Sequence, residues 1–265
     1  MAHVPEAATD FLRFRNVNVA RGESIVLHDI NLNIAAGEHV AILGPNGCGK
    51  STLIKTIACE CYPIVRPGMQ VNIYGRERWD LTELRKHLGV VQSGLPGVQT
   101  QRTTGLDAVI AGFFSASTLW PNLKVMDEMK MRAHEALERL TSEYLAAKLV
   151  GKMSSGEKRR ILIARALVHR PRTLLLDEPS NELDLAAQRE LREMLRRLAR
   201  EGTGILMVTH HLPDIIPEME RVLLMKEGRI AGDGSKRSML TPASLQMLFG
   251  VPVDVAERDG FFYSW

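Results

Sequence analysis

The sequence predicts an α/β fold with a mixed β-sheet, flanking helices, an antiparallel β subdomain and a helical insertion. The apolar segment 39–43 runs through a glycine-rich loop into a segment of helical character, which is the strand–loop–helix order of such folds. Two later runs, 174–176 and 205–208, are continuously apolar, as expected for parallel strands buried on both faces. Apolar and polar residues alternate over 30–34, which indicates a strand with one solvent-facing side.

Strands and helices are expected to alternate along most of the chain. Strands are expected, in chain order, over residues 11–19, 25–34, 39–43, 71–74, 88–91, 173–176, 205–208, 222–225 and 229–231. Helices are expected over residues 52–57, 127–140, 161–168 and 185–200. Glu227 and Gly228 separate the last two strands and are typical of a hairpin turn.

The central stretch of the chain differs from the rest. Between Ser93 and Lys152 the strand pattern is replaced by apolar residues at helical spacing, as at Ala133 and Leu137. We therefore expect an N-terminal extension over 1–10, an α/β domain over 11–250 with a helical subdomain at about 93–151, and a C-terminal tail over 251–265. A turn sequence in the tail predicts a small β-structure, which either packs on the core or meets a partner.

Composition excludes several classes of protein. The chain has 265 residues with 45% hydrophobic and 25% charged residues, which are ordinary globular values. A formal net charge of +3 is too small to imply nucleic acid as a partner. No apolar stretch approaches the ~20 residues that span a bilayer, and the first residues lack the pattern of a secretion signal. Cys48, Cys59 and Cys61 are too few and odd in number for a disulfide framework, so we expect a cytoplasmic location.

A glycine-rich loop after the strand at 39–43 matches the pattern G-x-x-x-x-G-K-[ST]. The loop is Gly44-Pro45-Asn46-Gly47-Cys48-Gly49-Lys50-Ser51, and Thr52 continues into the helix after it. The glycines let successive N–H groups face one anion, at the positive end of that helix. Lys50 can neutralise the β- and γ-phosphates, and the Ser51 hydroxyl can bind Mg²⁺. The sequence therefore predicts that the chain binds a nucleoside triphosphate.

Two adjacent carboxylates follow the apolar strand at 173–176. In phosphate-loop enzymes the first carboxylate holds Mg²⁺, which assigns that role to Asp177, opposite Ser51. Adjacent residues on a strand point in opposite directions, so we expect Glu178 to act instead as the general base for an attacking water. Two acids after a strand can also mark a helix start, but the upstream loop favours the catalytic interpretation.

A serine and a glutamate precede the helix at 161–168. Ser154 and Glu157 have the spacing of a capping box, which predicts a well-capped helix start. Ser154 and the N–H group of Gly156 are also placed to form a second anion site at the helix N-terminus. The residues alone leave both interpretations open.

Together these motifs resemble those of the ABC ATPases. The loop at 44–51, the Ser-x-Gly-Glu segment at 154–157 and the Asp-Glu pair at 177–178 occur in the order and spacing of that family. The resemblance covers about residues 11–250. It implies a P-loop NTPase core that hydrolyses ATP with Mg²⁺.

The resemblance also implies roles for residues that are otherwise ambiguous. Gln92 matches the Q-loop glutamine, which senses Mg²⁺ and the attacking water. Asp184 matches the D-loop aspartate, which contacts the neighbouring subunit. His210 matches the switch histidine that touches the γ-phosphate, and His211 beside it is the competing candidate.

The family geometry implies a head-to-tail dimer, or a pair with another ABC ATPase, with two ATP molecules at the interface. Ser154, Ser155 and Gly156 of one copy would close on the γ-phosphate held by the other copy. The resemblance thus implies the catalytic residues Lys50, Glu178 and His210 and the Mg²⁺-associated residues Ser51, Gln92 and Asp177.

Departures from the family pattern are confined to a few positions. Where the family usually stacks an aromatic residue on adenine, this chain has Arg21, whose planar guanidinium either stacks on the base or faces solvent. The usual Leu-Ser-Gly-Gly-Gln reads Met-Ser-Ser-Gly-Glu at 153–157, and the D-loop is altered ahead of Asp184. None of these changes removes a catalytic residue, so we expect an active ATPase.

Two functions fit this sequence. The first is the ATPase subunit of a transporter whose membrane subunits are separate chains, bound at the helical region and placing the protein on the inner face of the membrane. Segment 104–112 is similar to metal-chelate importer ATPases. The second is a soluble ABC ATPase with a regulatory role and no membrane partner. The Gly-Phe-Phe stretch at 112–114 resembles bacterial ATPases of that sort.

Overall fold

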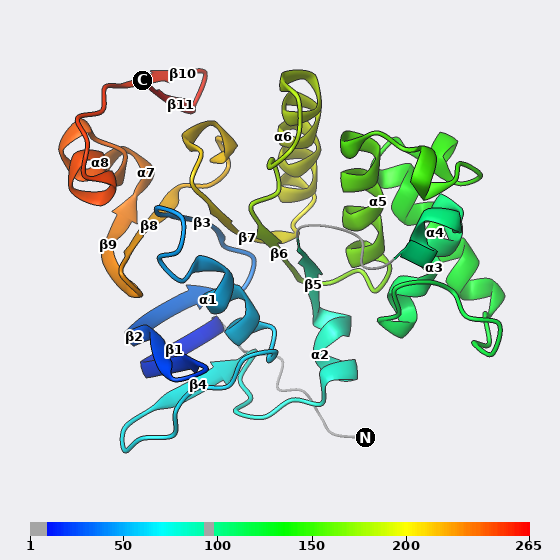
Figure 1. Ribbon diagram of the computed structural model, residues 1–265, viewed down its shortest axis with the longest axis horizontal. Coiled ribbons are helices and arrows are strands. Elements are labelled where there is room, and N and C mark those ends of the chain that lie inside the picture. Colours follow the sequence, from blue (N-terminus) through cyan, green and yellow to red (C-terminus); the bar gives the residue numbers. More distant parts are fainter. Residues whose placement is uncertain (1–9, 93–97) are drawn as a thin grey trace.

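The computed structural model describes residues 10–92 and 98–265 and has the predicted fold class (Figure 1). The predicted N-terminal extension, apart from Asp10, and residues 93–97 at the start of the predicted helical subdomain lie outside the described residues. A mixed sheet forms the centre, an antiparallel sheet lies below it in Figure 1, and a helical lobe lies to one side.

The mixed sheet has the strand order β5-β6-β7-β3-β8-β9 within the described residues. Its strands are β3 (His39–Leu43), β5 (Leu88–Val91), β6 (Thr173–Asp177), β7 (Gly204–Thr209), β8 (Arg221–Lys226) and β9 (Arg229–Ser235). All neighbours pair in parallel except β8 and β9, which form a hairpin. The continuous apolar runs are therefore parallel strands, as predicted.

Helix α1 (Lys50–Ile57) lies between the two sheets. The antiparallel sheet consists of β1 (Asp10–Arg21), β2 (Ser24–Ala35) and β4 (Gln70–Ile73), in the order β2-β1-β4. Alternate residues of β3 face opposite cores: Val40 and Ile42 pack toward α1, whereas Ala41 and Leu43 pack toward the helices on the other face. The phosphate loop at the start of α1 is thus fixed from both sides.

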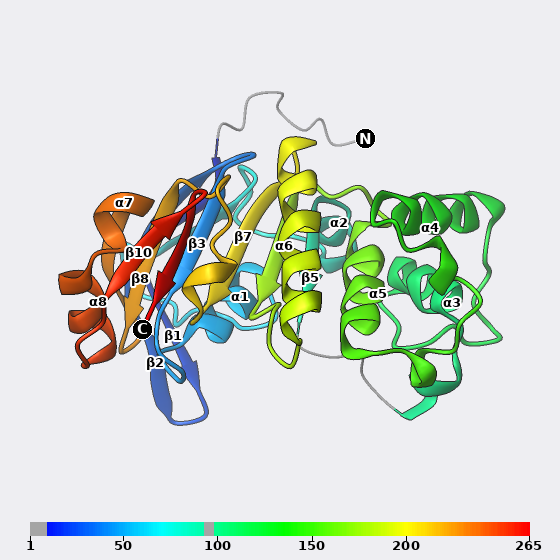
Figure 2. The same ribbon diagram turned by 90° about the horizontal axis from the view of Figure 1, so that it is seen from above.

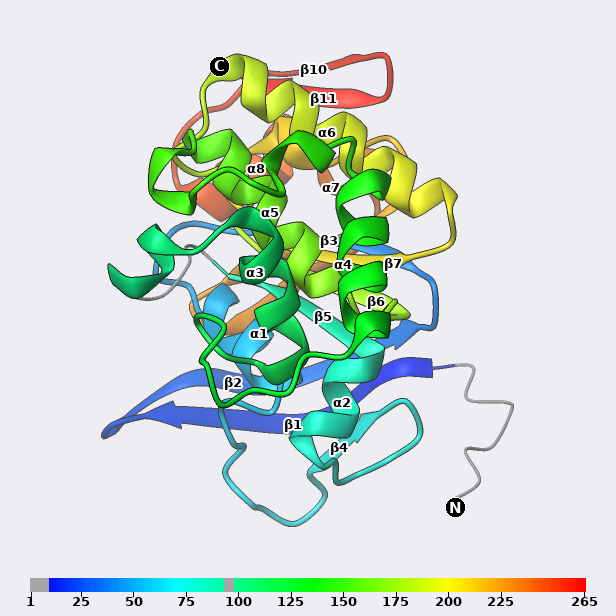
Figure 3. The ribbon, with the colours of Figure 1, turned by 90° about the vertical axis from the view of Figure 1, so that its right-hand side faces the viewer.

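The helical lobe packs against the edge of the mixed sheet that carries β5 (Figures 1 and 3). It contains α3 (Gly105–Ile110), α4 (Asp127–Arg139) and α5 (Ser155–Leu167), with short 3-10 helices at Val98–Arg102, Ala111–Phe114, Glu143–Leu145 and Val150–Lys152. α5 packs on both α3 and α4. The packed helical lobe therefore includes α5, which lies beyond the range of about 93–151 expected from the sequence.

The remaining helices cover the sheet and its ends. They are α2 (Leu81–His87), α6 (Leu185–Arg200), a 3-10 helix (Leu212–Asp214), α7 (Lys236–Met239) and α8 (Pro242–Phe249). α6 buries one face, including Leu191 and Leu195, and leaves Arg189, Arg197 and Arg200 exposed. Within the described part of the chain, no helix is long and apolar enough to cross a membrane.

The tail contains the predicted small β-structure, a hairpin of β10 (Val255–Arg258) and β11 (Phe261–Ser264). It packs on the core: Phe262 is buried, and the buried ammonium of Lys236 donates to the carbonyl of Gly260 at 3.0 Å. β11 packs against the 3-10 helix Leu212–Asp214, and Figure 1 shows the hairpin at the top of the molecule. The tail therefore packs on this chain's own core.

The turn between β8 and β9 holds the phosphate loop in place. The N–H group of Gly228 donates to the carbonyl of Cys48 at 3.0 Å, and the carbonyl of Gly228 accepts from the N–H group of His28 at 2.8 Å. Gly228 has φ +71°, and a Cβ added there would lie 2.1 Å from the carbonyl oxygen of Val26. Only glycine fits between the antiparallel sheet and the loop.

We predict that Gly228→Ala weakens ATP binding. The added methyl group displaces the turn, so the loop loses its hydrogen bond at Cys48, and a displacement of this kind lowers ATP affinity about tenfold or more. Titration of the purified protein with a fluorescent ATP analogue measures the change. Gly202→Ala is the matched control, because Gly202 has φ +91° with nothing within 4 Å of the added Cβ. Equal ATP affinities for the two variants would contradict the prediction.

Candidate functional site

The predicted site residues meet where three parallel strands end. In the register of the sheet, Leu43 pairs with Thr209 and Asp177 pairs with Val208. The phosphate loop after β3, the two carboxylates at the end of β6 and the histidines after β7 therefore emerge at the same edge.

The phosphate loop has the backbone that its glycines predict. Gly47 and Gly49 have φ +78° and +103°, and Gly49 is the N-cap of α1. A Cβ at Gly44 would lie 2.3 Å from the carbonyl oxygen of Met225. Asn46 and Gly47 are exposed, whereas Cys48 is buried and burial raises the pKa of its thiol. Cys48 therefore acts as a small packing residue that stays protonated.

Lys50 is turned back onto its own loop. Its ammonium donates to the carbonyls of Gly44 at 2.9 Å and Pro45 at 3.0 Å, and lies 3.2 Å from Oε1 of Glu178. Only 4% of Lys50 is exposed. A buried cation needs such partners, because an unpaired one carries a large desolvation cost. The next two residues of α1 differ: Ser51 is half-buried, while Thr52 is buried.

Glu178 is at the centre of the site. Besides Lys50, its carboxylate accepts a hydrogen bond from Nδ2 of Asn181 at 2.5 Å and lies 3.1 Å from Nδ1 of His210. Burial raises the pKa of Glu178, but Asn181, Lys50 and His210 together outweigh burial and lower it. The carboxylate is therefore ionised at neutral pH, as a general base must be.

Of the two adjacent histidines, His210 faces the carboxylate. Nδ1 of His210 lies close to the carboxylate of Glu178 but forms no hydrogen bond with it. This buried atom has no hydrogen-bond partner in the part of the chain that the structure describes. The rings of His210 and His211 lie 3.9 Å apart. The geometry thus favours the predicted choice of His210 over His211.

Asp177 and Ser51 are placed to share a metal ion. The Ser51 hydroxyl donates to Oδ1 of Asp177 at 3.0 Å. Burial raises the pKa of Asp177, which is 8% exposed, so its carboxylate would gain from a cation. The described residues contain no cluster of three or more His, Cys, Asp or Glu that could hold a metal. This fits Mg²⁺, which typically uses one or two protein oxygens and completes its shell with phosphate and water.

A buried aspartate connects the two segments that carry Glu178 and His210. Asp214 accepts from the Ser180 hydroxyl at 2.5 Å and from the Thr209 hydroxyl at 2.8 Å. Ser180 lies two residues after Glu178, and Thr209 directly precedes His210. The sequence analysis missed the roles of both residues: Asp214 lies outside every recognised motif, and Asn181 lies in the D-loop but was given no contact with Glu178.

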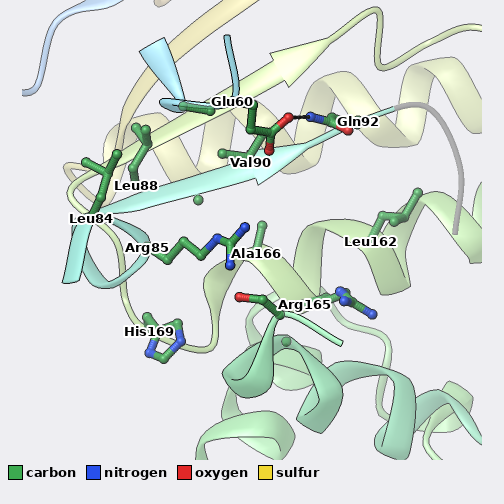
Figure 4. Close-up of a pocket in the computed structure, with 14 residues that line it drawn as sticks. Glu60, Leu84, Arg85, Leu88, Val90, Gln92, Leu162, Arg165, Ala166 and His169 are labelled. Carbon is green, nitrogen blue, oxygen red and sulfur yellow. Dashed lines mark hydrogen bonds between the residues drawn. The ribbon is translucent and has the colours of Figure 1, made fainter. Parts of the chain in front are cut away.

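Gln92 is held away from this cluster by a neighbouring loop. Its Nε2 atom donates to Oε2 of Glu60 at 2.9 Å (Figure 4). Both residues line a pocket of about 250 Å³ between β5, α2, α5 and the 3-10 helix Ala111–Phe114. Arg85 points into this pocket and Arg165 flanks it, so the lining carries positive charge.

The segment Ser154–Gly156, which we call the signature turn, lies in the helical lobe. Ser154 caps α5 in the predicted capping box: its hydroxyl accepts from the N–H group of Glu157 at 3.2 Å, and Glu157 accepts from the N–H group of Ser154 at 2.8 Å. A hydroxyl that accepts still has its proton to donate. Capping therefore leaves Ser154 free to bind an anion, and the two interpretations do not exclude each other.

The remaining predicted residues lie on the surface. Ser155 is exposed at the start of α5, and exposed Asp184 caps α6, accepting from the N–H group of Ala187 at 2.8 Å. Arg21 is exposed at the turn between β1 and β2, where it pairs with Ser24. No hydrogen bond or ion pair within the described residues joins these side chains to the cluster around Glu178.

Known proteins resemble this chain over most of its length. The family model for ABC transporters matches residues 27–181. An uncharacterized ABC transporter ATP-binding protein of Methanocaldococcus jannaschii is 33% identical, over 95% of this chain and 86% of that protein.

Solved structures agree with this similarity. One is cbiO1 from Clostridium perfringens, part of the ABC transporter complex cbiONQ, with a TM-score of 0.74, 29% identity and coverage of 90% of this chain and 94% of that one. Another is a dimeric ATP-binding cassette in a post-hydrolysis state with ADP and Pi, with a TM-score of 0.69, 28% identity and coverage of 84% and 98%. The chain therefore belongs to the ABC transporter family and is an ATP-binding, ABC-type ATPase.

Proposed function

We propose that this chain is the ATP-binding subunit of a transporter and hydrolyses ATP in a head-to-tail dimer to drive separate membrane subunits. The observation that carries the proposal is the meeting of Lys50, Asp177, Glu178 and His210 at one edge of the sheet. In this arrangement a cation, a metal-binding carboxylate, a base and an imidazole surround the exposed end of the phosphate loop.

Each residue has a distinct role in the proposed reaction. The loop N–H groups and Lys50 bind the phosphates, and Ser51 and Asp177 would hold Mg²⁺. Gln92 would support them after leaving Glu60, to which it is hydrogen-bonded in this structure. When bound, Mg²⁺ neutralises charge on the β- and γ-phosphates. Glu178 takes a proton from the attacking water. Its pKa is lowered, so it acts by position and by its ionised state.

Asn181 and His210 orient the base. Asn181 fixes one oxygen of Glu178 at 2.5 Å, while His210 lies 3.1 Å from the same oxygen. Lys50 occupies the other oxygen at 3.2 Å. An incoming γ-phosphate competes for Lys50, which frees that oxygen of Glu178 for water.

A second copy would complete the site. Ser154, Ser155 and Asp184 are exposed, and the signature turn and Asp184 lie outside the Glu178 cluster of their own chain. A helix N-terminus with a free hydroxyl proton is a suitable anion site. The similar cassette in the post-hydrolysis state is dimeric. We therefore place the signature turn of one copy on the γ-phosphate bound by the other, with Arg21 beside the adenine.

The membrane partner is proposed to bind at the pocket between β5 and the helical lobe. This pocket lies next to Gln92, so a partner there is linked to the nucleotide site (Figure 4). The similar protein cbiO1 is part of a transporter complex. The alternative is a regulatory ABC ATPase without a membrane partner, located wholly in the cytoplasm.

We predict that Glu178→Gln keeps ATP binding but lowers kcat at least about 100-fold, because the amide cannot accept the proton from water. The same variant should accumulate as a dimer in ATP, measured by size-exclusion chromatography with light scattering. Glu193→Gln, on the exposed face of α6, is the control and should hydrolyse ATP like the wild type. Wild-type turnover by Glu178→Gln would remove Glu178 from the proposed role.

We also predict that the native protein co-purifies with an integral membrane protein from the membrane fraction. Arg85→Glu should reduce this recovery about tenfold or more, because it reverses a charge inside a proposed interface. Arg258→Glu is the control, since Arg258 is 86% exposed on the tail hairpin. Recovery in the soluble fraction alone, without a spanning partner, would favour the regulatory alternative.

A further inference from the structure

A buried, incompletely paired arginine lies one turn beyond the signature turn. Arg159 on α5 is only 8% exposed. Its Nη1 atom is shut off from solvent and has no hydrogen-bond partner among residues 10–92 and 98–265. A guanidinium stays charged at any physiological pH, and a buried charge without a full set of partners costs folding free energy. A buried charge at this position therefore calls for a functional explanation.

Two carboxylates provide the negative charge that acts on Arg159. Burial lowers the pKa of Arg159, and the charges of Glu182 and Asp177, in that order, raise it. Asp177 is already engaged by the Ser51 hydroxyl at 3.0 Å. Glu182 is exposed, and its carboxylate has no hydrogen-bond or ion-pair partner among the described residues. Glu182 is therefore the available anion.

The segment that carries Glu182 is strained at both ends. Glu178 has φ 46° and Glu182 has φ 64°. Both values lie in the left-handed region, which non-glycine residues rarely adopt and which needs support from surrounding structure. An attraction between Glu182 and a fixed cation provides such support.

The first turns of α5 and α6 are in direct contact. A Cβ added at Gly156 would lie 3.0 Å from the Cβ of Ala187, and Nη2 of Arg160 donates to Oε2 of Glu190 at 2.5 Å. Figure 2 shows the two helices side by side. The signature turn and Asp184, which caps α6, therefore belong to one continuous surface.

We propose that Arg159 is a positioning residue whose buried cation attracts the carboxylate of Glu182, without a direct ion pair, and thereby keeps the signature turn and the segment 178–184 in the single arrangement that a second copy can bind. The inference rests on the proposed function, because both parts are expected to act across the dimer. Neither Arg159 nor Glu182 belongs to the phosphate loop. The pair should therefore affect turnover and dimer formation while leaving ATP binding by the single chain unchanged.

A double-mutant cycle tests the pair. Arg159→Gln and Glu182→Gln should each lower kcat about fivefold, and the double variant should lose no more than the worse single variant, because coupled residues are not additive. ATP affinity of the isolated chain should stay within about twofold of the wild type. Arg159→Lys, which keeps the charge, should recover part of kcat.

If Arg159 had a purely structural role, kcat and the thermal unfolding midpoint would fall together in Arg159→Gln. The proposal expects them to separate. Removing a buried charge that lacks a direct partner is often neutral or stabilising, so the unfolding midpoint of Arg159→Gln should equal or exceed that of the wild type while kcat falls. Glu190→Gln breaks the exposed pair with Arg160 on the same helices and is the matched control, with near wild-type kcat expected. Additive losses, wild-type kcat in Arg159→Gln, or a fall in kcat that follows a fall in unfolding midpoint would overturn the inference.

The same preparations separate this inference from the proposed function. If Glu178→Gln forms no dimer in ATP, the proposed function fails whatever the cycle shows. If Glu178→Gln dimerises in ATP and adding Arg159→Gln to it leaves the dimer yield unchanged, only the positioning role of Arg159 and its attraction to Glu182 fail. Loss of that dimer on adding Arg159→Gln is the expected result.

Discussion

The parallel register of β6, β7 and β3 is the constraint on which the rest of the structure depends. Parallel strands that start and end together bring their following loops to one edge, although the loops are far apart in sequence. Here the register places the phosphate loop, Glu178 and His210 within contact of one another. Packing of β3 into cores on both of its faces then fixes this edge. The register of the main chain therefore brings the reacting side chains to one place.

Around that edge, charges are balanced by short-range partners. The pKa of Glu178 is lowered because Asn181, Lys50 and His210 together outweigh the effect of burial. The pKa of Asp177 beside it is raised by burial. Adjacent residues thus have pKa values moved in opposite directions. A carboxylate with a raised pKa gains most from a cation, and one with a lowered pKa remains ready to accept a proton. The difference in environment separates the metal-binding role from the basic role.

The sequence predicted those parts of the fold and site that have strong local signals. The strands of the mixed sheet, the phosphate loop and the Asp-Glu pair follow from apolar runs and fixed spacings. α2 was missed because seven residues are too few for a helical period, although Asp80 caps it by accepting from the N–H groups of Thr82 and Glu83. Asp214 and the Glu60–Gln92 contact were missed because they depend on tertiary proximity, which spacing does not encode. The roles of Arg21 and Ser154 in binding remain predictions.

The position of Lys50 has a consequence for selectivity. Its ammonium is already saturated by two carbonyls and a carboxylate, so an arriving phosphate must replace these acceptors. The free energy of phosphate binding at Lys50 is then the difference between its contacts with phosphate and its contacts with these acceptors. A small free anion such as inorganic phosphate offers little more than what it displaces. A triphosphate adds contacts along the whole loop, so the contacts that Lys50 already makes favour a triphosphate over a simple anion.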